Sequence, residues 1–231
     1  MAAVFPSDIQ NLQYYMSFQF KSYARDTSSL GGINNGSVGA LGQNIILPMP
    51  ERINDNPTQN WGEDKIPINE VLGGIAGLIP GVGAVASTLQ NASPYTGYFT
   101  GKIPNPFLVM LYKQPNFKRF NFSWTLAPKN QQESQNLNDI VKEFKNNMLP
   151  SSEGNFFGTS NQLKYPNVVT PSFQPNSKYL FNFKDCAIES VNVDYTGAGI
   201  PAFFKNSQAP AEIKLRISLI EIDYWLQGQD I

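Results

Sequence analysis

Two pairs of acidic residues are close enough in the sequence to suggest general acid–base chemistry. The pairs are Asp185 with Glu189 and Glu221 with Asp223. Residues two apart on a strand share a face, so Glu221 and Asp223 could approach each other if this stretch is extended. No nucleophile, set of metal ligands or glycine-rich phosphate cradle lies near either pair in the sequence. We therefore interpret all four as solvated charges at strand edges, and the sequence predicts no enzyme.

The residue types on which many active sites depend are scarce. Histidine is absent, which excludes Ser/His and Cys/His nucleophilic pairs, histidine-containing zinc sites and a histidine pH switch. Cys186 is the sole cysteine, so no internal disulfide forms and no oxidising compartment is required. We interpret Cys186 as a small core residue. The sequence predicts no cofactor and no metal site.

The most apolar stretch, residues 71–86, has three competing interpretations. A membrane span needs about 20 apolar residues, whereas this run is shorter and is broken by Pro80 and several glycines. Residues 81–86 match the G-x-G-x-x-A pattern of dinucleotide sites, but no acidic residue that could bind a ribose occurs between Glu70 and Glu133. We favour small-residue helical turns that lie against a partner surface, and we expect no membrane insertion.

The composition is typical of a β-rich chain with many turns. It includes 18 Gly, 17 Pro and 13% aromatic residues. The balance of 17 Lys and Arg against 18 Asp and Glu leaves no net field that would hold nucleic acid or an acidic membrane. Only 15% of residues are charged, so we expect other chains to cover much of the surface. The N-terminus lacks the pattern of a signal peptide, which predicts assembly inside the cell.

The clearest alternation lies near the C-terminus and predicts two strands, at 179–195 and 211–225. In the first, Ala187 is expected to share a face with Val191 and Val193. In the second, the apolar phase flips after Leu219, which requires a bulge, a bend or burial of both faces. The loop that joins the two strands is rich in Gly, Pro and aromatic residues.

Earlier in the chain, alternation predicts further strands and one helix. Residues 12–24 form a strand with Tyr14, Met16, Phe18 and Phe20 on one face, and residues 44–47 form a short strand. Residues 106–113 are predicted as a buried strand that forms a hairpin with residues 120–126. Asn130 and Glu133 predict the start of a helix, which ends at Pro150. Its apolar stripe is Leu137, Ile140, Val141, Phe144 and Met148.

The chain is predicted to be one domain over residues 1–231. Two irregular regions interrupt it, a Gly/Asn-rich loop at 26–43 and a Gly/Ala-rich insertion at about 51–104. Trp61 is expected to be exposed among the polar residues at the start of this insertion.

Four stretches form an ordered set of motifs that carries a resemblance. They are NIILPMPERIND (44–55), FKRFNFSWTLAPKNQQESQNLNDIVKEFK (117–145), FKDCAIESVNVDYTGAG (183–199) and APAEIKLRISLIEI (209–222). The second is the distinctive one, with an aromatic strand, a T-L-x-P turn and an amphipathic helix. Together they resemble the tail-tube proteins of contractile phages, most closely the T4-type tail tube cap family. The resemblance covers most of residues 105–225, although this chain lacks that family's long Ser-rich N-terminal region.

The resemblance implies a mainly β subunit with one packed α-helix, a tail-tube-like sandwich or barrel whose strands continue into a hexameric ring barrel. It implies a structural virion protein, assembled in the host cytoplasm, that sits on the baseplate hub. There the ring would cap or initiate the tail tube and template the tube and sheath. The implied partners are its own copies, the tube and tube initiator proteins, the hub and wedge proteins and the sheath, while DNA only passes through the lumen. The tube initiator, or a tube subunit of a related contractile injection system, remains an alternative.

The candidate contacts between subunits or between rings are Trp61, Gly197, Gly199, Pro201, Phe203 and Phe204. Aromatic residues in the Gly/Pro loop 196–210 suit interface anchors. The alternative is that Phe203 and Phe204 fold back on their own sheet.

A different class of function also fits the aromatic content. A free-standing β-sandwich could bind carbohydrate with Trp61, Trp124 or the pair Tyr95 and Tyr98 as stacking platforms. Trp124 belongs to an alternation that is predicted to be core, which counts against that interpretation.

Overall fold

The computed structural model describes residues 2–23, 38–65, 108–152, 163–197 and 199–229. The chain divides into two compact units, one made of Met1–Thr58 with Asn116–Ile231 and the other of Gln59–Pro115. The first unit holds a large sheet and a helix, and the second holds a two-stranded ribbon.

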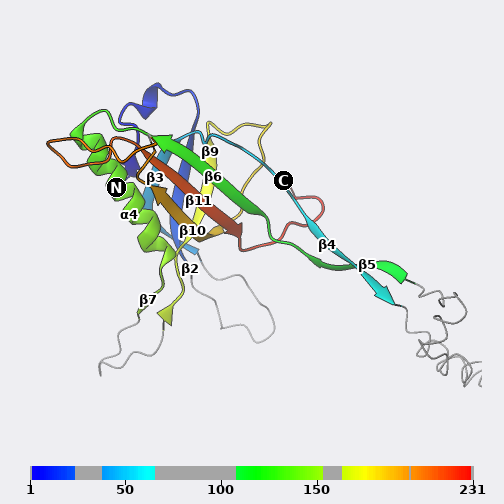
Figure 1. Ribbon diagram of the computed structural model, residues 1–231. Coiled ribbons are helices and arrows are strands. Elements are labelled where there is room, and N and C mark those ends of the chain that lie inside the picture. Colours follow the sequence, from blue (N-terminus) through cyan, green and yellow to red (C-terminus); the bar gives the residue numbers. More distant parts are fainter. Residues whose placement is uncertain (1, 24–37, 66–107, 153–162, 198, 230–231) are drawn as a thin grey trace, which may run out of the picture. The chain divides into compact units, whose positions relative to one another are not determined.

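A seven-stranded mixed sheet forms the first unit (Figure 1). Its strand order is β1-β3-β2-β9-β10-β11-β6, in which β1 runs parallel to β3 and the other neighbours are antiparallel. The described residues therefore confirm a mainly β fold with one packed α-helix. The strands are β1 Ala2–Val4, β2 Tyr15–Tyr23, β3 Val38–Pro48, β6 Arg119–Leu126, β9 Val168–Gln174, β10 Cys186–Asp194 and β11 Ile213–Glu221.

Smaller elements complete the described chain. A 3-10 turn, η1, spans Ile9–Asn11, and the helix α4 spans Gln131–Met148. The two-residue strands β7 (Ser151–Ser152) and β8 (Leu163–Lys164) pair with each other. No helix in the described part of the chain is long and apolar enough to cross a membrane.

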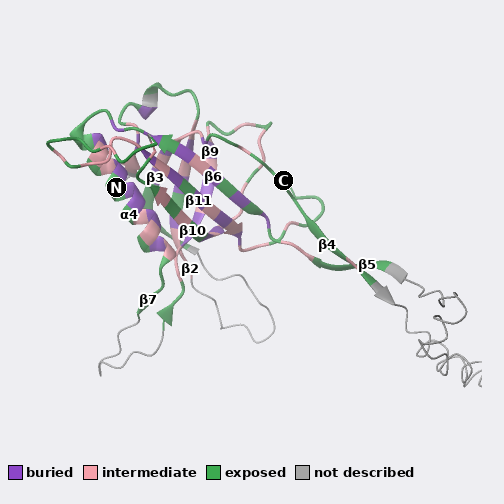
Figure 2. Ribbon diagram, in the orientation of Figure 1, coloured by how far each residue is buried: buried purple, intermediate pink, exposed green. Residues whose placement is uncertain are grey.

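The core is built from the inward residues of alternating strand positions. On β2, Met16, Phe18 and Phe20 have no exposed surface, whereas the residues between them are partly or fully exposed. The alternation follows from the period of two in strand geometry and is visible as buried and exposed bands in Figure 2. The strand predicted for residues 12–24 is confirmed over Tyr15–Tyr23, with Met16, Phe18 and Phe20 on one face. Residues 12–14 precede it, and Tyr14 is 49% exposed, while residue 24 lies outside the described residues.

Asn130 and Glu133 fix the start of α4. The Asn130 side-chain oxygen accepts a hydrogen bond from the Glu133 N–H at 2.9 Å, which satisfies a free donor of the first turn. The buried Glu133 carboxylate accepts hydrogen bonds from the Ser7 hydroxyl at 2.6 Å, from the Ser7 N–H and from the Lys129 N–H. These bonds, the Ser7 hydroxyl above all, lower the pKa of Glu133. The predicted cap therefore also fastens the N-terminal segment.

The apolar stripe of α4 packs against the sheet as predicted. Leu137, Ile140, Val141 and Phe144 are buried, and Met148 is partly buried. The Phe144 ring meets Phe18 and Phe20 edge to face, with ring centroids 5.3 and 5.6 Å apart. The helix ends before Pro150, which lacks an N–H and cannot continue it.

A β-bulge in β10 decides which face its side chains occupy. The register with β11 shifts after Ile188, and Glu189 is the extra residue. Ile188 is buried before the bulge, and Val191 and Val193 pack against the same core after it. The prediction that Ala187 shares a face with these valines is wrong, because the extra residue shifts the alternation by one.

In contrast, β11 keeps a regular register with β6 from Ile213 to Ile220. Of the alternatives expected after Leu219, a bulge in β11 does not occur, but the strand ends at Glu221 and bends follow at Ile222 and Asp223. Ile220 lies on the outward side and is only partly buried, whereas Glu221 is 1% exposed. The apparent flip of phase therefore reflects one apolar residue on the outer face and one acidic residue in the interior.

Three local predictions are wrong. Residues 38–43, expected in a loop, belong to β3, and residues 59–65, expected to be irregular, form β4. Residues 106–113, expected to pair with 120–126, overlap β5 (Leu108–Pro115), which instead pairs with β4 (Gln59–Lys65), while β6 pairs with β11. The side chains of Met110, Leu111 and Tyr112 on β5 are exposed rather than buried. Hydrogen bonds between strands that are distant in sequence override the local pattern.

Candidate interaction surface

The connection between β10 and β11 is held in shape by its own hydrogen bonds. Phe203 forms an isolated bridge with Pro210, and the Phe204 N–H donates to the Ala209 carbonyl at 2.9 Å. Gly199 has a φ of 89°, a left-handed conformation that favours glycine. The connection therefore presents its side chains from a defined backbone.

Five of the predicted contact residues lie in this connection: Gly197, Gly199, Pro201, Phe203 and Phe204. Phe203 is 58% exposed and Phe204 is 40% exposed, so the alternative that both fold back on their own sheet is wrong. Gly197 is partly buried, and a Cβ there would lie 2.7 Å from a carboxylate oxygen of Glu212, so a larger residue would not fit without movement. The arrangement suits an interface anchor, because large apolar side chains are exposed on an ordered loop.

A cavity of about 320 Å³ lies between this connection and α4. Its apolar lining includes Leu137, Val141 and Ile213, and its polar lining includes Gln135 and the half-exposed Tyr195. No charged side chain lines it. The cavity therefore suits an uncharged segment or side chain.

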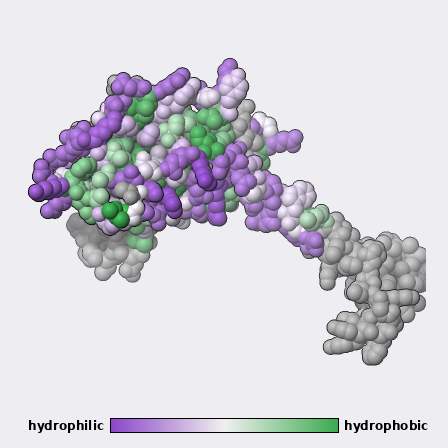
Figure 3. Space-filling view, turned by 45° about the horizontal axis from the view of Figure 1, so that its top comes forward, coloured by the Kyte–Doolittle hydropathy of each residue, from purple (hydrophilic) through white to green (hydrophobic). Residues whose placement is uncertain are grey.

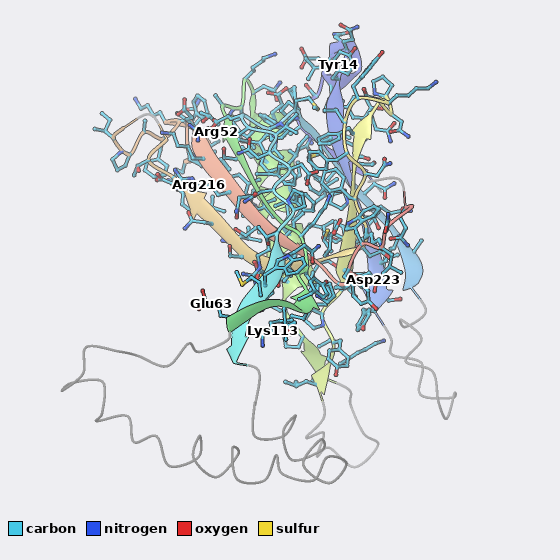
Figure 4. All side chains as sticks on the ribbon, turned by 90° about the vertical axis from the view of Figure 1, so that its right-hand side faces the viewer. Tyr14, Arg52, Glu63, Lys113, Arg216 and Asp223 are labelled. Carbon is cyan, nitrogen blue, oxygen red and sulfur yellow. The ribbon has the colours of Figure 1, made fainter. Side chains whose placement is uncertain are left out.

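Trp61 belongs to the second unit and forms a separate candidate surface there. It stands directly opposite Tyr112 on the β4–β5 ribbon, with ring centroids 5.4 Å apart in an edge-to-face arrangement. The exposed fractions are 57% for Trp61, 49% for Tyr112 and 59% for Met110, which shares their face. The ribbon also carries Glu63 and Lys113, labelled in Figure 4. A two-stranded ribbon is at best marginally stable alone in water, so this apolar face suits a covering partner.

Several strands of the large sheet have edges without a strand partner within the described residues, among them β10 and β6. β10 pairs with β11 along most of its length but meets β9 at only two positions, Cys186 and Ala187. β6 is the last strand of the sheet, and its outer side is approached by the Glu51 N–H, which donates to the Ser123 carbonyl at 2.9 Å. Open edges are templates for pairing with another chain.

Glu221 differs most from its predicted role. Its carboxylate accepts hydrogen bonds from the Lys184 N–H at 3.0 Å and from the Trp225 indole N–H at 2.6 Å. Burial raises the pKa of Glu221. The interpretation of this residue as a solvated edge charge is wrong, because it faces the interior, while Asp223 lies beyond the end of β11 (Figure 4).

The other acidic pair is divided between two cations. Asp185 is bonded to Lys21 at 2.8 Å and to the Thr170 hydroxyl. Glu189 pairs with Arg119 at 3.3 Å and is exposed, as predicted. Each carboxylate therefore has its own positive partner.

The remaining predicted residues have mixed outcomes. Cys186 is a buried core residue as predicted, and burial raises the pKa of its thiol above the usual range. Trp124 is 2% exposed and its indole N–H donates to the Pro48 carbonyl at 2.8 Å, so it is no stacking platform. Tyr95, Tyr98 and residues 71–86 lie outside the described residues. Among the described residues, no cluster of His, Cys, Asp and Glu could hold a metal ion.

No protein-family model and no curated protein matches this sequence.

Several residues of these surfaces were missed by sequence reasoning. Ile200 and Tyr195 extend the exposed loop, at 71% and 46% exposed. A sequence signal existed for both, because they flank the predicted contact residues. Tyr112 and Met110 were instead assigned to a buried strand, since an apolar run does not reveal its exposure.

Proposed function

We propose that this chain is a structural subunit of a contractile phage tail. Six copies form a ring on the baseplate hub that caps or initiates the tail tube. Two things support the proposal: the ordered motifs that resemble those of the tail-tube proteins, and strand edges of the sheet that lack a strand partner within the described residues. The tube initiator, or a tube subunit of a related contractile injection system, would use the same geometry.

The observation that carries the proposal is the open edge of β10. Residues 188–194 pair on one side with β11 and have no strand partner on the other within the described part of the chain. Proteins usually shorten, charge or cover such edges. Pairing with a neighbouring copy would satisfy the free backbone groups, and a closed ring would leave no edge exposed.

The surface composition favours the same conclusion. Hydrophobic residues are visible among hydrophilic ones over the face shown in Figure 3. They include large side chains with about half or more of their surface exposed, such as Trp61, Met110, Ile200 and Phe203. Two groups of neighbouring exposed apolar residues, Trp61 with Met110 on the ribbon and Ile200 with Phe203 on the connection, are typical of surfaces that contact other chains.

In this function the ring is a template. It presents a six-fold edge on which the tail tube and the sheath polymerise, and it contacts the hub and wedge proteins of the baseplate. DNA passes through its lumen. The site of action is the virion, after assembly in the host cytoplasm.

Proline substitutions at Asn192 and Val193 test the proposal. The N–H groups of adjacent strand residues point to opposite sides, so one proline removes a bond to β11 and the other removes an outward N–H. We expect the proline that removes a bond to β11 to make the subunit unfold more easily. The proline that removes an outward N–H should keep the fold of the free subunit but lose the ring, as measured by light scattering and electron microscopy.

Alanine at the same two positions is the matched control and should leave the ring intact. A ring that survives both prolines, or a wild-type protein that stays monomeric and is absent from tail particles, would contradict the proposal. Glycan binding by that monomer would instead favour the carbohydrate-binding class, with Trp61 as the remaining platform.

A further inference from the structure

The outward face of β10, β11 and β6 is a regular array of polar side chains. Directly opposed residues of an antiparallel sheet share a face, and the register therefore sets three rows. We call these rows, together with the neighbouring Arg119, Glu189 and Glu51, the charge-paired face. The rows are Asp194–Lys214–Thr125, Asn192–Arg216–Ser123 and Ser190–Ser218–Asn121.

The charges on this face balance. Its three basic residues are Arg119, Lys214 and Arg216, and its three acidic residues are Glu51, Glu189 and Asp194. Arg119 pairs with Glu189 at 3.3 Å, and Asp194 stands directly opposite Lys214. Arg216, labelled in Figure 4, acts with Lys214 on Glu51. Arg52 and Glu212, which flank the face in sequence, add one charge of each sign.

The polar groups of the face are also bonded to one another. The Glu51 carboxylate accepts hydrogen bonds from the Thr125 hydroxyl at 2.6 Å and the Ser123 hydroxyl at 3.0 Å. These bonds, and to a smaller extent the two nearby cations, lower the pKa of Glu51. The Ser218 hydroxyl donates to the Asn121 side-chain oxygen at 2.6 Å. Lys214 and Arg216 form no ion pair among the described residues, but both act electrostatically on Glu51 and on Asp194, which keeps acidic charge near each of them.

This face also differs from the rest of the described surface in its lack of apolar groups. The exposed large hydrophobic residues lie elsewhere, for example on the β10–β11 connection and on the ribbon. Ile220 stands opposite Arg119, at the register position next to the row Ser190–Ser218–Asn121, and is partly buried. A face meant for docking would carry apolar anchors, so this one suits contact with water.

Balanced charge has a specific consequence for a polyanion. Unopposed lysines and arginines hold phosphates because binding releases counterions. A basic group beside an acid presents only a dipole, and charges are largely screened beyond about 8 Å at physiological ionic strength. Such a face neither holds nor strongly repels DNA.

We propose that the charge-paired face is the surface past which duplex DNA moves, so that this face lines the passage of the ring. The inference rests on the proposed function and specifies which side of the sheet faces the DNA. The helix α4 and the core then lie on the side of the sheet away from the passage.

Removing the acids without changing their shape tests the charge pairing. The variant Glu51→Gln/Glu189→Gln/Asp194→Asn leaves three basic residues unopposed. We expect it to bind a short random-sequence duplex at low salt about tenfold or more tightly than wild type. The logarithm of its DNA-binding constant should fall with the logarithm of the salt concentration with a slope of about −3, since each of three neutralised phosphates contributes about −0.9.

The matched control, Asp8→Asn/Glu63→Gln/Asp139→Asn, makes the same change in net charge at exposed sites outside the face. It should bind DNA as weakly as wild type. Equal binding by the two triple variants would show that only net charge matters and would overturn the inference. A face variant that binds no better than wild type would overturn it as well.

A cysteine probe tests the position of the face. The native thiol, Cys186, is buried and does not interfere. In Asn121→Cys, we expect a bulky polyethylene-glycol maleimide to label the free subunit but not the intact tail, whereas a small maleimide labels both. If Asn121→Cys fails to fold because it loses the hydrogen bond from Ser218, Asn192→Cys on the same face replaces it as the probe.

Labelling of the intact tail by the bulky reagent at the rate seen in the free subunit would overturn the inference while leaving the ring in place. Absence of the chain from purified tails would instead overturn the proposed function, and the passage with it. The two failures are therefore distinguishable.

Discussion

At the residue scale, Glu221 belongs to a buried cluster of charges around one indole ring. The Trp225 N–H donates to its carboxylate, while the ammonium groups of Lys118 and Lys184 lie 5.2 and 4.6 Å from the centroid of the same ring. Lys118 is itself 6% exposed and pairs with Asp55 at 3.1 Å. Buried charges need such partners, because desolvation without them is costly. The cluster fastens residues after β11 to the end of the sheet.

Trp225→Phe should destabilise the subunit in a pH-dependent way. Burial raises the pKa of Glu221, so its contribution to stability is complete below the unfolded-state value of about 4.3 and is lost as pH rises through the folded-state value. The indole N–H supports only the charged form. We expect the free energy of unfolding to fall by about 1–3 kcal/mol at neutral pH and by less in acid, where the carboxyl is protonated.

Urea unfolding of the free subunit at both pH values measures this difference. Tyr224→Phe, next to Trp225 and half-exposed, is the control and should change little at either pH. An equal loss for Trp225→Phe at both values would show that the indole acts through packing alone.

At the element scale, locally encoded features could be predicted and non-local ones could not. The N-cap, the apolar stripe and the end of α4 each depend on residues within one short stretch of sequence. The alternation of β2 is local in the same way. The partner of β6 lies about 90 residues away on β11, so the local hairpin with residues 106–113 was a wrong inference. The Gly/Pro setting of Phe203 indicated a loop but left open whether the ring is exposed or folds back on its own sheet; the structure shows it to be exposed. The pairing of Trp61 with Tyr112 could not be predicted, because it depends on β4 meeting β5.

Phe144→Ala should remove a contact between α4 and β2. The side chain is fully buried and touches Phe18 and Phe20, so we expect a loss of about 3–5 kcal/mol from the cavity and the lost transfer free energy. Denaturant unfolding of the free subunit measures it. Lys142→Ala on the exposed face of the same helix should change stability by less than about 0.5 kcal/mol. A small loss at Phe144 would mean that α4 does not contribute to the core.

At the scale of the whole molecule, a buried core stabilises the chain, whereas its surface carries a strand edge without a strand partner among the described residues and exposed aromatic side chains. The core is continuous from β2 through α4 to β6, while β10 has an open edge and the β10–β11 connection exposes its aromatic rings. Stability of the single chain and assembly of the proposed ring should therefore be separable by mutation.

Phe203→Ser/Phe204→Ser should affect assembly and not folding. Both side chains are exposed, so the unfolding free energy of the free subunit should change by no more than about 0.5 kcal/mol each. Ring formation, or stacking of tube on ring, should fail in sedimentation and electron microscopy. Normal assembly of this variant would show that the Phe203 and Phe204 side chains are not interface anchors.

The extra residue in β10 has a consequence for natural variation in length. Removal of Glu189 would join Ile188 to Ser190 in an ordinary ladder, with every later side chain on the side it already occupies. Loss of Ser190 would have the same effect, because Glu189 would then stand opposite Ser218. Loss of a residue after Ser190 would instead turn part of the strand over and place polar groups on the core side. Among homologous sequences, a one-codon gap in this strand should therefore occur at position 189 or 190 and be purged at the positions that follow.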